Sequence, residues 1–231
     1  MAMKAFTNPF YLPLLAALVV SACSKNGTGS SINQDVAIPG VDPDRPQVSE
    51  AERIQEEVAI GDYPKVELMT SQGRIVIALY TDKAPATTRN FLSYVESKHY
   101  DNTVFHRVVN NLLIQGGSYT PDYRFKPDGK FTPSESNNGL RNKRGTVAIA
   151  RRLNDANAAG AQFFINLVDN PQFDFVSATD ASTRGYTVFG QVVEGMDIVD
   201  SMRSVPTNAR EGISEAVPVK PLIIKQALPL E

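Results

Sequence analysis

The chain has 231 residues, 42% of them hydrophobic and 21% charged, which suits one globular domain of up to about 200 residues with some additional chain. Its 23 basic and 25 acidic residues give a net charge of -2, which argues against a dedicated nucleic-acid-binding protein because such proteins need a cationic surplus. The single cysteine excludes an intramolecular disulfide, a cysteine zinc cluster and a CxxC redox motif, and two histidines leave little for a histidine metal site.

The first 22 residues have the pattern of a secretory signal. Lys4 is the only charged residue before position 23, and the run from Phe10 to Ala22 is almost wholly apolar. This run is shorter than the roughly 20 residues that a bilayer span requires, and Pro13 interrupts it. Small residues at its end are typical of a cleavage site. We therefore expect residues 1–22 to be removed as a signal peptide.

The only cysteine follows this segment directly. The sequence Val20-Ser21-Ala22-Cys23 resembles the lipobox of bacterial lipoproteins, which implies cleavage before Cys23 and attachment of fatty acyl chains to that residue. Ser24 stands where some members have aspartate, and in that family this favours the outer membrane. The alternatives are an ordinary signal with an unrelated cysteine, or a buried core cysteine. The resemblance predicts a lipid-anchored protein of the bacterial cell envelope that faces the periplasm.

Residues 23–63 have the composition of a tether. Most of the segment is rich in Gly, Ser, Asn and Asp, contains several prolines and shows no apolar periodicity. Near its end, Ser49 and Glu52 have capping-box spacing and predict a short helix over 49–60. This helix either docks on the following domain or stands apart from it.

From residue 64 to residue 231 the pattern changes to short alternating strands, which predicts one domain. Pro85 and the apolar stripe after it predict a helix of about twelve residues, and the spacing of Ile198 and Met202 predicts a second helix over Gly195–Met202. The stretch from Ser118 to Arg144 reads as a long surface loop. These elements suggest a mainly β fold, a closed antiparallel barrel capped by two helices. The eight predicted strands are Lys65–Met69, Arg74–Tyr80, Thr103–Val109, Leu112–Gln115, Thr146–Ala150, Phe163–Leu167, Thr187–Val193 and Leu222–Ala227.

No familiar catalytic signature occurs in the sequence. GxSxG, GxxxxGK[ST], HExxH and GxGxxG motifs are absent, and no spacing indicates a Ser-His-Asp triad. The segment Asn154-Asp155-Ala156-Asn157 resembles a calcium loop only faintly, because Gly and Glu are not at the required positions, and we interpret it as a polar turn. We therefore expect neither a metal ion nor a cofactor.

One apolar β segment, FHRVVNNLLIQGG from Phe105 to Gly117, contains an arginine. An arginine in such a run is costly unless it faces solvent or has partners. Strict alternation places Arg107 on one face with Phe105 and Val109, and we expect that face to be a partly apolar concave surface.

Four motifs in order resemble the cyclophilin family of peptidyl-prolyl isomerases. They are FHRVV…IQGG, NNGLRNKRGTVAIAR, AQFFIN and YTVFGQVVEGMDIVD, and the resemblance covers residues 64–231. It is closest in style to the short bacterial members. The family fold is an eight-stranded antiparallel barrel capped by two helices, which agrees with the elements expected from the residues.

The resemblance implies a role for each matching residue. Arg107 would be the catalytic residue that stabilises the twisted amide, and Gln115 would orient it or bind the substrate backbone. His106 is expected to be structural rather than an acid or base. The implied substrate-binding residues are Leu112, Leu113, Phe164 and Phe173 for the proline ring, and Ala150, Arg151, Gln162 and Tyr186 beside it.

The sequence departs from the common family pattern in places. Leu112 replaces a pocket phenylalanine, Gln172 stands where many members carry tryptophan, and Tyr186 and Arg151 replace a histidine and an asparagine of many eukaryotic members. The segment from Arg151 to Gln162 is longer than in common members. These changes keep the slot apolar but alter its rim, so we do not expect cyclosporin to bind.

The leading hypothesis is a peptidyl-prolyl cis-trans isomerase that assists the folding of envelope proteins. Its expected partners are proline-containing polypeptides and, through the lipid on Cys23, a membrane, and we expect a monomer that binds no nucleic acid. The alternative is a cyclophilin-fold chaperone or scaffold with weak or no isomerase activity, because Leu112 and Gln172 alter the pocket. A hydrolase comes third, since no nucleophile signature supports it.

Overall fold

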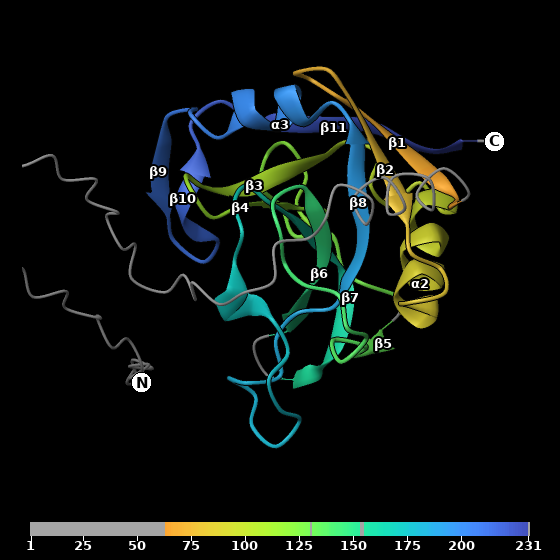
Figure 1. Cartoon of the computed structure of the whole chain (residues 1–231). Coiled ribbons are helices and arrows are strands. Elements are labelled where there is room, and N and C mark those ends of the chain that lie inside the picture. Colours follow the sequence, from red (N-terminus) through yellow and green to blue (C-terminus); the bar gives the residue numbers. More distant parts are fainter. Residues whose placement is uncertain (1–62, 130, 153–154, 231) are drawn as a thin grey trace, which may run out of the picture. The chain divides into compact units, whose positions relative to one another are not determined.

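Eight antiparallel strands close into a barrel in the computed structural model, which describes residues 63–129, 131–152 and 155–230 (Figure 1). Neighbouring strands pair in the order β4-β3-β11-β1-β2-β8-β6-β7, and pairing of β4 with β7 completes the ring. This confirms the predicted barrel. The strands are β1 Lys65–Thr70, β2 Arg74–Leu79, β3 Thr103–Val109, β4 Leu113–Gly116, β6 Thr146–Arg152, β7 Asp155–Asn166, β8 Val188–Glu194 and β11 Leu222–Leu230.

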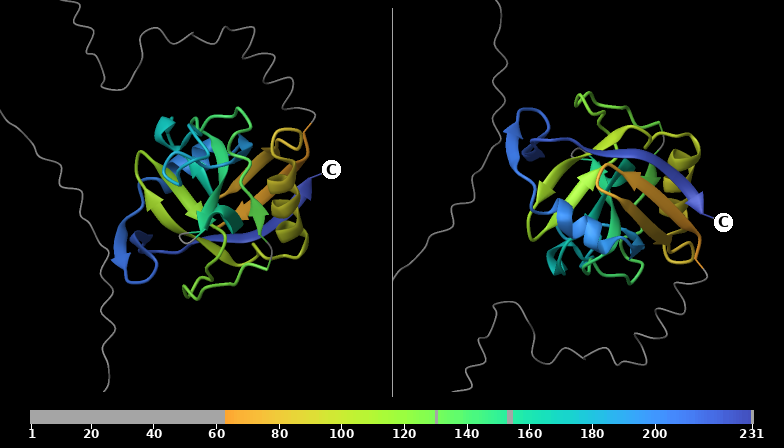
Figure 2. Two further views of the ribbon diagram at one scale, coloured as in Figure 1. Left: turned by 90° about the horizontal axis from the view of Figure 1, so that it is seen from below. Right: turned by 90° about the horizontal axis from the view of Figure 1, so that it is seen from above.

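Both predicted helices are present and add side chains to the barrel core. Helix α2 spans Pro85–Glu96, begins with proline as expected, and lies beside β11 and the short strand β5 (Thr132–Pro133) in Figure 2. Helix α3 spans Met196–Met202 and follows Gly195, which has a φ of 84°. A Cβ at Gly195 would lie 2.2 Å from the carbonyl oxygen of Arg74. Glycine is therefore required for the chain to pass this close to β2.

The buried apolar side chains of the described residues form two separate clusters. The larger one fills the barrel and includes Phe91 and Val199 from the two helices. The smaller one contains Leu113, Ala148 and Phe164. The residues next to them along their strands belong to the large cluster. Since successive side chains of a strand point to opposite faces, the smaller cluster lies on the outer face of the barrel wall.

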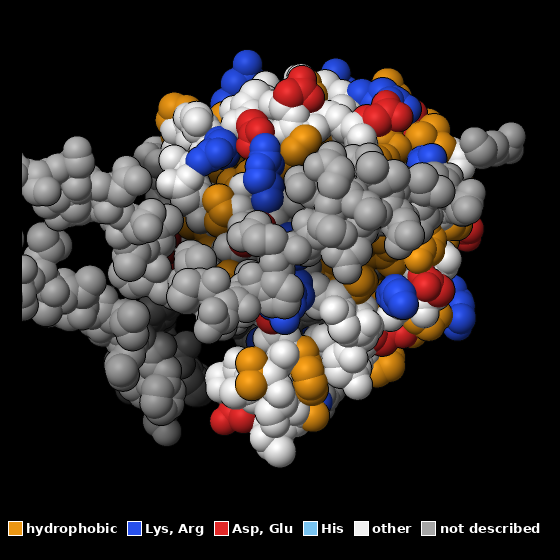
Figure 3. Space-filling model, viewed as in Figure 1, with side chains coloured by type: hydrophobic (Ala, Val, Ile, Leu, Met, Phe, Trp, Pro, Cys, Tyr) orange, Lys and Arg blue, Asp and Glu red, His pale blue; other side chains and the backbone are white. Residues whose placement is uncertain are grey.

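The long segment between β4 and β6 is mostly irregular, as expected. It contains a two-residue strand, β5 Thr132–Pro133, which pairs with β7, and an isolated bridge between Tyr119 and Phe125. On the face shown in Figure 3, the described basic and acidic side chains are interspersed, in keeping with a net charge of -2.

Several elements differ from the sequence-based expectation. The predicted strand Phe163–Leu167 is the end of the longer strand β7, and β6 continues to Arg152, so the segment expected to be a polar turn, residues 154–157, is strand from Asp155 on. A two-stranded sheet formed by β9 Thr207–Arg210 and β10 Ser214–Pro218, and the 3-10 turn η1 Pro171–Phe173, were not predicted. Apolar alternation could not reveal β9, because its residues are mostly exposed.

The expected signal peptide, the tether, Cys23 and the 49–60 helix lie outside the described residues. In the part of the chain that the structure covers, no helix is long and apolar enough to cross a membrane.

Candidate active site

A bulge in β3 turns two consecutive side chains toward the same cavity. The pairing of β3 with β4 shifts between Phe105 and Arg107, so His106 is the extra residue. Phe105 is fully buried in the barrel core, whereas His106 and Arg107 both line the cavity. The prediction that Arg107 shares a face with Phe105 is therefore wrong. A bulge interrupts alternation and redirects side chains, which sequence periodicity cannot anticipate.

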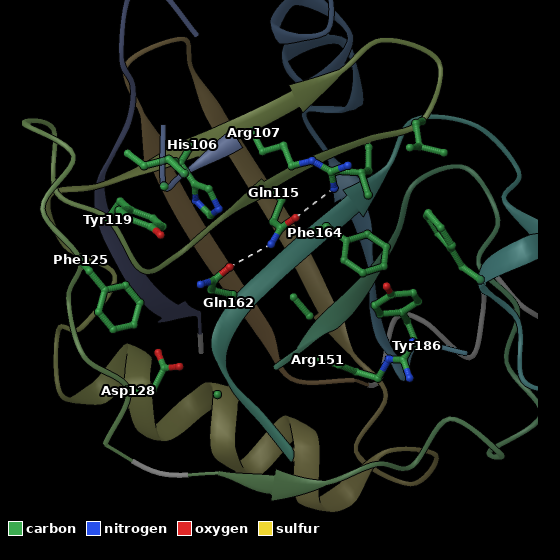
Figure 4. A pocket seen from close by; sticks show the side chains of 17 residues that line it. His106, Arg107, Gln115, Tyr119, Phe125, Asp128, Arg151, Gln162, Phe164 and Tyr186 are labelled. Carbon is green, nitrogen blue, oxygen red and sulfur yellow. Dashed lines mark hydrogen bonds between the residues drawn. The ribbon is translucent and has the colours of Figure 1, made fainter. Parts of the chain in front are cut away.

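Three polar side chains form a hydrogen-bonded row across the cavity (Figure 4). Arg107 Nη1 donates to Gln115 Oε1 at 3.3 Å, and Gln115 Nε2 donates to Gln162 Oε1 at 2.9 Å. The strand register brings them together, because Arg107 on β3 pairs with Gln115 on β4 and β4 pairs with β7. Gln162 thus fixes the orientation of the Gln115 amide, whose oxygen in turn holds the guanidinium.

An apolar slot lies on one side of this row. Its base is Phe164, which is 2% exposed and belongs to the outer cluster. Phe173 and Tyr186 pack edge-on against Phe164, with ring centroids 5.7 and 5.3 Å away. Such edge-to-face contacts hold the rings in place. Leu112 and Leu113 complete the lining, so the slot offers a rigid apolar surface for a small ring.

Arg151 closes one edge of the slot. Its guanidinium carbon lies 4.5 Å from the centre of the Tyr186 ring, and its Nη1 donates to the carbonyl oxygen of Ala181 at 2.8 Å. It therefore stacks on the aromatic ring and also ties the segment before Tyr186 to β6. Ala150, just before it on β6, lines the cavity with only its small methyl group.

His106 lies on the other side of the polar row and is 3% exposed. Burial, together with the charge of Arg107, lowers the pKa of His106 to about 4. Its ring packs on Tyr119 at 4.6 Å between centroids, and Nδ1 has no hydrogen-bond partner among the described residues. At neutral pH His106 is uncharged, so the cavity wall carries the charge of Arg107 alone at this point.

All ten residues that the sequence assigned to catalysis or substrate binding line one cavity of about 850 Å³. Gln172 does not line it, and its amide instead donates to Asn170 Oδ1 at 3.0 Å. The sequence did not single out six further lining residues besides His106, because they lie in irregular segments, in the extended part of β7 or at the β9–β10 turn. The assigned residues are Arg107, Leu112, Leu113, Gln115, Ala150, Arg151, Gln162, Phe164, Phe173 and Tyr186, and the missed ones are Tyr119, Phe125, Asp128, Gly160, Gly212 and Ile213.

The described residues contain no group of three or more His, Cys, Asp and Glu side chains that could hold a metal ion. The groups that line the cavity are instead the guanidinium groups of Arg107 and Arg151, two side-chain amides, one carboxylate and an apolar slot. This arrangement can stabilise a change in charge distribution on a bound peptide without breaking a bond.

Known proteins are similar to this chain in sequence and in fold. A profile of the cyclophilin type peptidyl-prolyl cis-trans isomerases matches residues 65–227. Peptidyl-prolyl cis-trans isomerase cyp18 of Streptomyces antibioticus is 49% identical over 162 residues, which cover 70% of this chain and 96% of that protein. Peptidyl-prolyl cis-trans isomerase B of Escherichia coli K12 is 45% identical over 162 residues, which cover 69% and 96%.

A solved structure supports the same fold. The crystal structure of a cyclophilin type peptidyl-prolyl cis-trans isomerase from Cryptosporidium parvum matches with a TM-score of 0.59. The match covers 73% of this chain and 98% of that one at 23% sequence identity, so it concerns the fold alone.

Proposed function

This chain belongs to the cyclophilin-type peptidyl-prolyl cis-trans isomerases, and from that premise we propose that Arg107 catalyses the rotation of X-Pro bonds bound in its cavity. The observation that carries the proposal is the position of Arg107 between a hydrogen-bonded amide row and an apolar slot (Figure 4). The slot accepts the proline ring, and the row holds the guanidinium beside the bond that rotates.

The chemistry needs electrostatic stabilisation rather than a nucleophile. Rotation about an X-Pro amide has a barrier of about 18–20 kcal/mol, and the uncatalysed exchange takes tens of seconds or longer. In the twisted state the amide loses conjugation, so the proline nitrogen becomes more basic. A permanently charged guanidinium that donates to the twisted amide more strongly than to either planar form lowers this barrier. Arg107 meets this requirement because Gln115 fixes its position.

The apolar slot supplies the binding energy that holds the bond in place. Leu113 and Phe164 belong to the outer cluster and are 3% and 2% exposed, so buried, packed side chains form the base of the slot. A proline ring that fills the slot leaves the residue before it free to swing. A fixed proline ring with a free preceding residue favours rotation about the X-Pro bond over tight binding of either the cis or the trans isomer.

The decisive experiment is proline-limited refolding of a model protein in the presence of the purified chain. The Arg107→Ala variant should lower kcat/KM about 100- to 1000-fold, the usual effect of removing one donor that acts on the transition state. Arg107→Lys keeps the charge but loses the planar fork, and should give an intermediate rate. Arg141→Ala removes an exposed arginine that does not line the cavity, and serves as the matched control.

An unchanged rate in Arg107→Ala would overturn this mechanism. If instead the original protein accelerated refolding weakly or not at all, and Arg107→Ala bound peptides and prevented aggregation as well as the original protein, the chaperone alternative would take its place.

We further propose that the natural substrates are folding proteins of the bacterial envelope and that the chain acts from a lipid anchor at Cys23. The support comes from the sequence, in which the only cysteine directly follows an apolar segment ending in Val20-Ser21-Ala22. Several acyl chains anchor a protein firmly, whereas one chain gives only marginal membrane binding.

A further inference from the structure

The cavity continues beyond the slot that the proposed isomerase mechanism uses. On the far side of the Gln115–Gln162 pair it is lined by Tyr119, Phe125 and Asp128 (Figure 4). We refer to these three residues as the acidic end. At about 850 Å³, the whole cavity is much larger than a proline ring needs and has room for several residues of a bound peptide.

Asp128 brings a carboxylate into this end without a cationic partner among the described residues. Its Oδ1 accepts a hydrogen bond from Ser118 Oγ at 3.1 Å. The nearby Lys126 is engaged elsewhere, since its Nζ donates to the carbonyl oxygen of His99 at 2.6 Å. The carboxylate is half-buried. Since a carboxylate can accept several hydrogen bonds, it can accept more from a ligand in the cavity than the one from Ser118.

The backbone of β7 makes room for this carboxylate. A Cβ at Gly160 would lie 2.2 Å from Asp128 Oδ2, so any other residue there would displace the acidic group. Gly160 itself lines the cavity. The position of Asp128 therefore depends on a glycine in the middle of a strand, where glycine is otherwise unfavourable.

Aromatic rings form the remaining walls. Tyr119 and Phe125 lie 5.6 Å apart between ring centroids in an edge arrangement, and Phe125 is 51% exposed at the rim. His106, which packs on Tyr119, is neutral because its burial depresses its pKa. Aromatic faces beside a carboxylate suit an alkyl chain that ends in a positive charge.

The positive charge of Arg107 does not oppose such a ligand directly. In Figure 4 the Arg107 guanidinium extends toward the Phe164 side, and Gln115 and Gln162 lie between it and Asp128. The two ends of the cavity therefore differ in charge, and a peptide lying across the amide row would meet both.

We propose that the acidic end binds a lysine or arginine side chain of the substrate, a few residues from the proline in the slot. The inference rests on the proposed isomerase function and adds a substrate preference to it. Asp128 would pair with the cation, while Tyr119 and Phe125 would cover its aliphatic stem.

The test compares peptides of one length that carry lysine or norleucine at each of two positions before and two positions after the proline. Norleucine matches the lysine stem without its charge. For the original protein, kcat/KM should favour lysine over norleucine about 5- to 10-fold at one position, the size expected of a partly buried ion pair. This ratio should shrink when the salt concentration rises.

Variants identify the group responsible. Asp128→Asn keeps an acceptor for Ser118 and should bring the lysine-to-norleucine ratio close to one. Asp122→Asn is the matched control, because Asp122 is an exposed acid of the same loop that pairs with Arg124 and does not line the cavity. It should keep the original ratio.

Two results would overturn the inference: a lysine preference absent at all four positions, or one that survives in Asp128→Asn. If no peptide were isomerised faster than it is spontaneously, the proposed function itself would fail, and the inference with it. That outcome is distinguishable from a normal rate without lysine preference.

Discussion

Two neighbouring side chains of β3 line the same cavity, but at pH 7 one is charged and the other is neutral. Arg107 brings a positive charge, whereas burial and the charge of Arg107 lower the pKa of His106 to about 4. The bulge that exposes both residues to the cavity thus places only one charge there at pH 7. A second positive charge at position 106 would weaken the attraction of the acidic end for a cation.

This pKa has a consequence for stability. In the unfolded chain His106 takes up a proton as the pH falls through about 6.5, whereas in the folded chain it stays neutral until about pH 4. The unfolded state therefore binds more protons between these values. We expect the free energy of unfolding to fall by up to about 3 kcal/mol from this residue alone as the pH drops from 7 to 4.

Urea unfolding at pH 7 and pH 4.5 checks this prediction. His106→Asn should lose that part of the pH dependence, whatever its stability at pH 7, because asparagine does not titrate. Carboxylates titrate equally in both proteins, so the difference between the two pH dependences isolates His106. Equal pH dependence in the variant and the original protein would show that His106 is protonated at a normal pKa.

Family motifs predict the site residues that they cover, whereas local backbone geometry decides the residues that the sequence does not predict. The resemblance assigned Arg107 and Gln115, which lie within hydrogen-bonding distance. Alternation placed Phe105 beside Arg107 because no residue pattern announces a bulge. Asp128 was missed because it belongs to an irregular loop, and only tertiary structure brings that loop against β7.

At the scale of elements, helix α2 depends on a residue far away in the sequence. Its N-terminal position Ala84 has no side chain that can cap the helix. Instead Glu135 Oε1 accepts from the Ala86 N–H at 3.0 Å, and Oε2 accepts from the Thr87 N–H at 2.8 Å. A carboxylate at this end of a helix satisfies free N–H groups and matches the helix dipole.

We expect Glu135→Ala to lower the free energy of unfolding by about 1–2 kcal/mol, as the loss of an N-cap does. Urea denaturation measures this. Glu96→Ala removes an exposed acid from the other end of the same helix and should change stability by less than about 0.5 kcal/mol. Equal effects of the two substitutions would show that Glu135 contributes only through net charge.

Helices and strands can likewise be predicted where local sequence determines them, but not where contacts with distant residues do. The eight barrel strands were predicted because each buries alternating or continuous apolar residues. Strands β9 and β10 were missed because tertiary contacts hold them in place: Tyr123 donates to the carbonyl oxygen of Pro218 at 2.9 Å, and Arg210 stacks on the Tyr123 ring. In Figures 1 and 2 this pair lies on the opposite side of the barrel from α2.

At the scale of the whole molecule, the proposed anchor is a property of the full chain rather than of the barrel. Cys23→Ser in the full-length protein should move it from the membrane fraction to the periplasmic fraction, because a hydroxyl cannot receive the lipid through the thiol chemistry. Fractionation followed by immunoblotting measures this. Ser31→Ala, a neutral change in the same linker, should leave the protein with the membranes. Continued pelleting of Cys23→Ser would place the anchor elsewhere.

The separation of the two apolar clusters bears on how such a protein can evolve. The cluster inside the barrel holds the fold together, whereas the slot is built on the smaller cluster outside it, with Phe173 and Tyr186 at its edge. Residues such as Leu112 and Arg151 can therefore change the ligand surface while the interior packing stays intact. Substitutions at the rim therefore have little effect on the stability of the fold. One fold can thus acquire new peptide preferences without first becoming more stable.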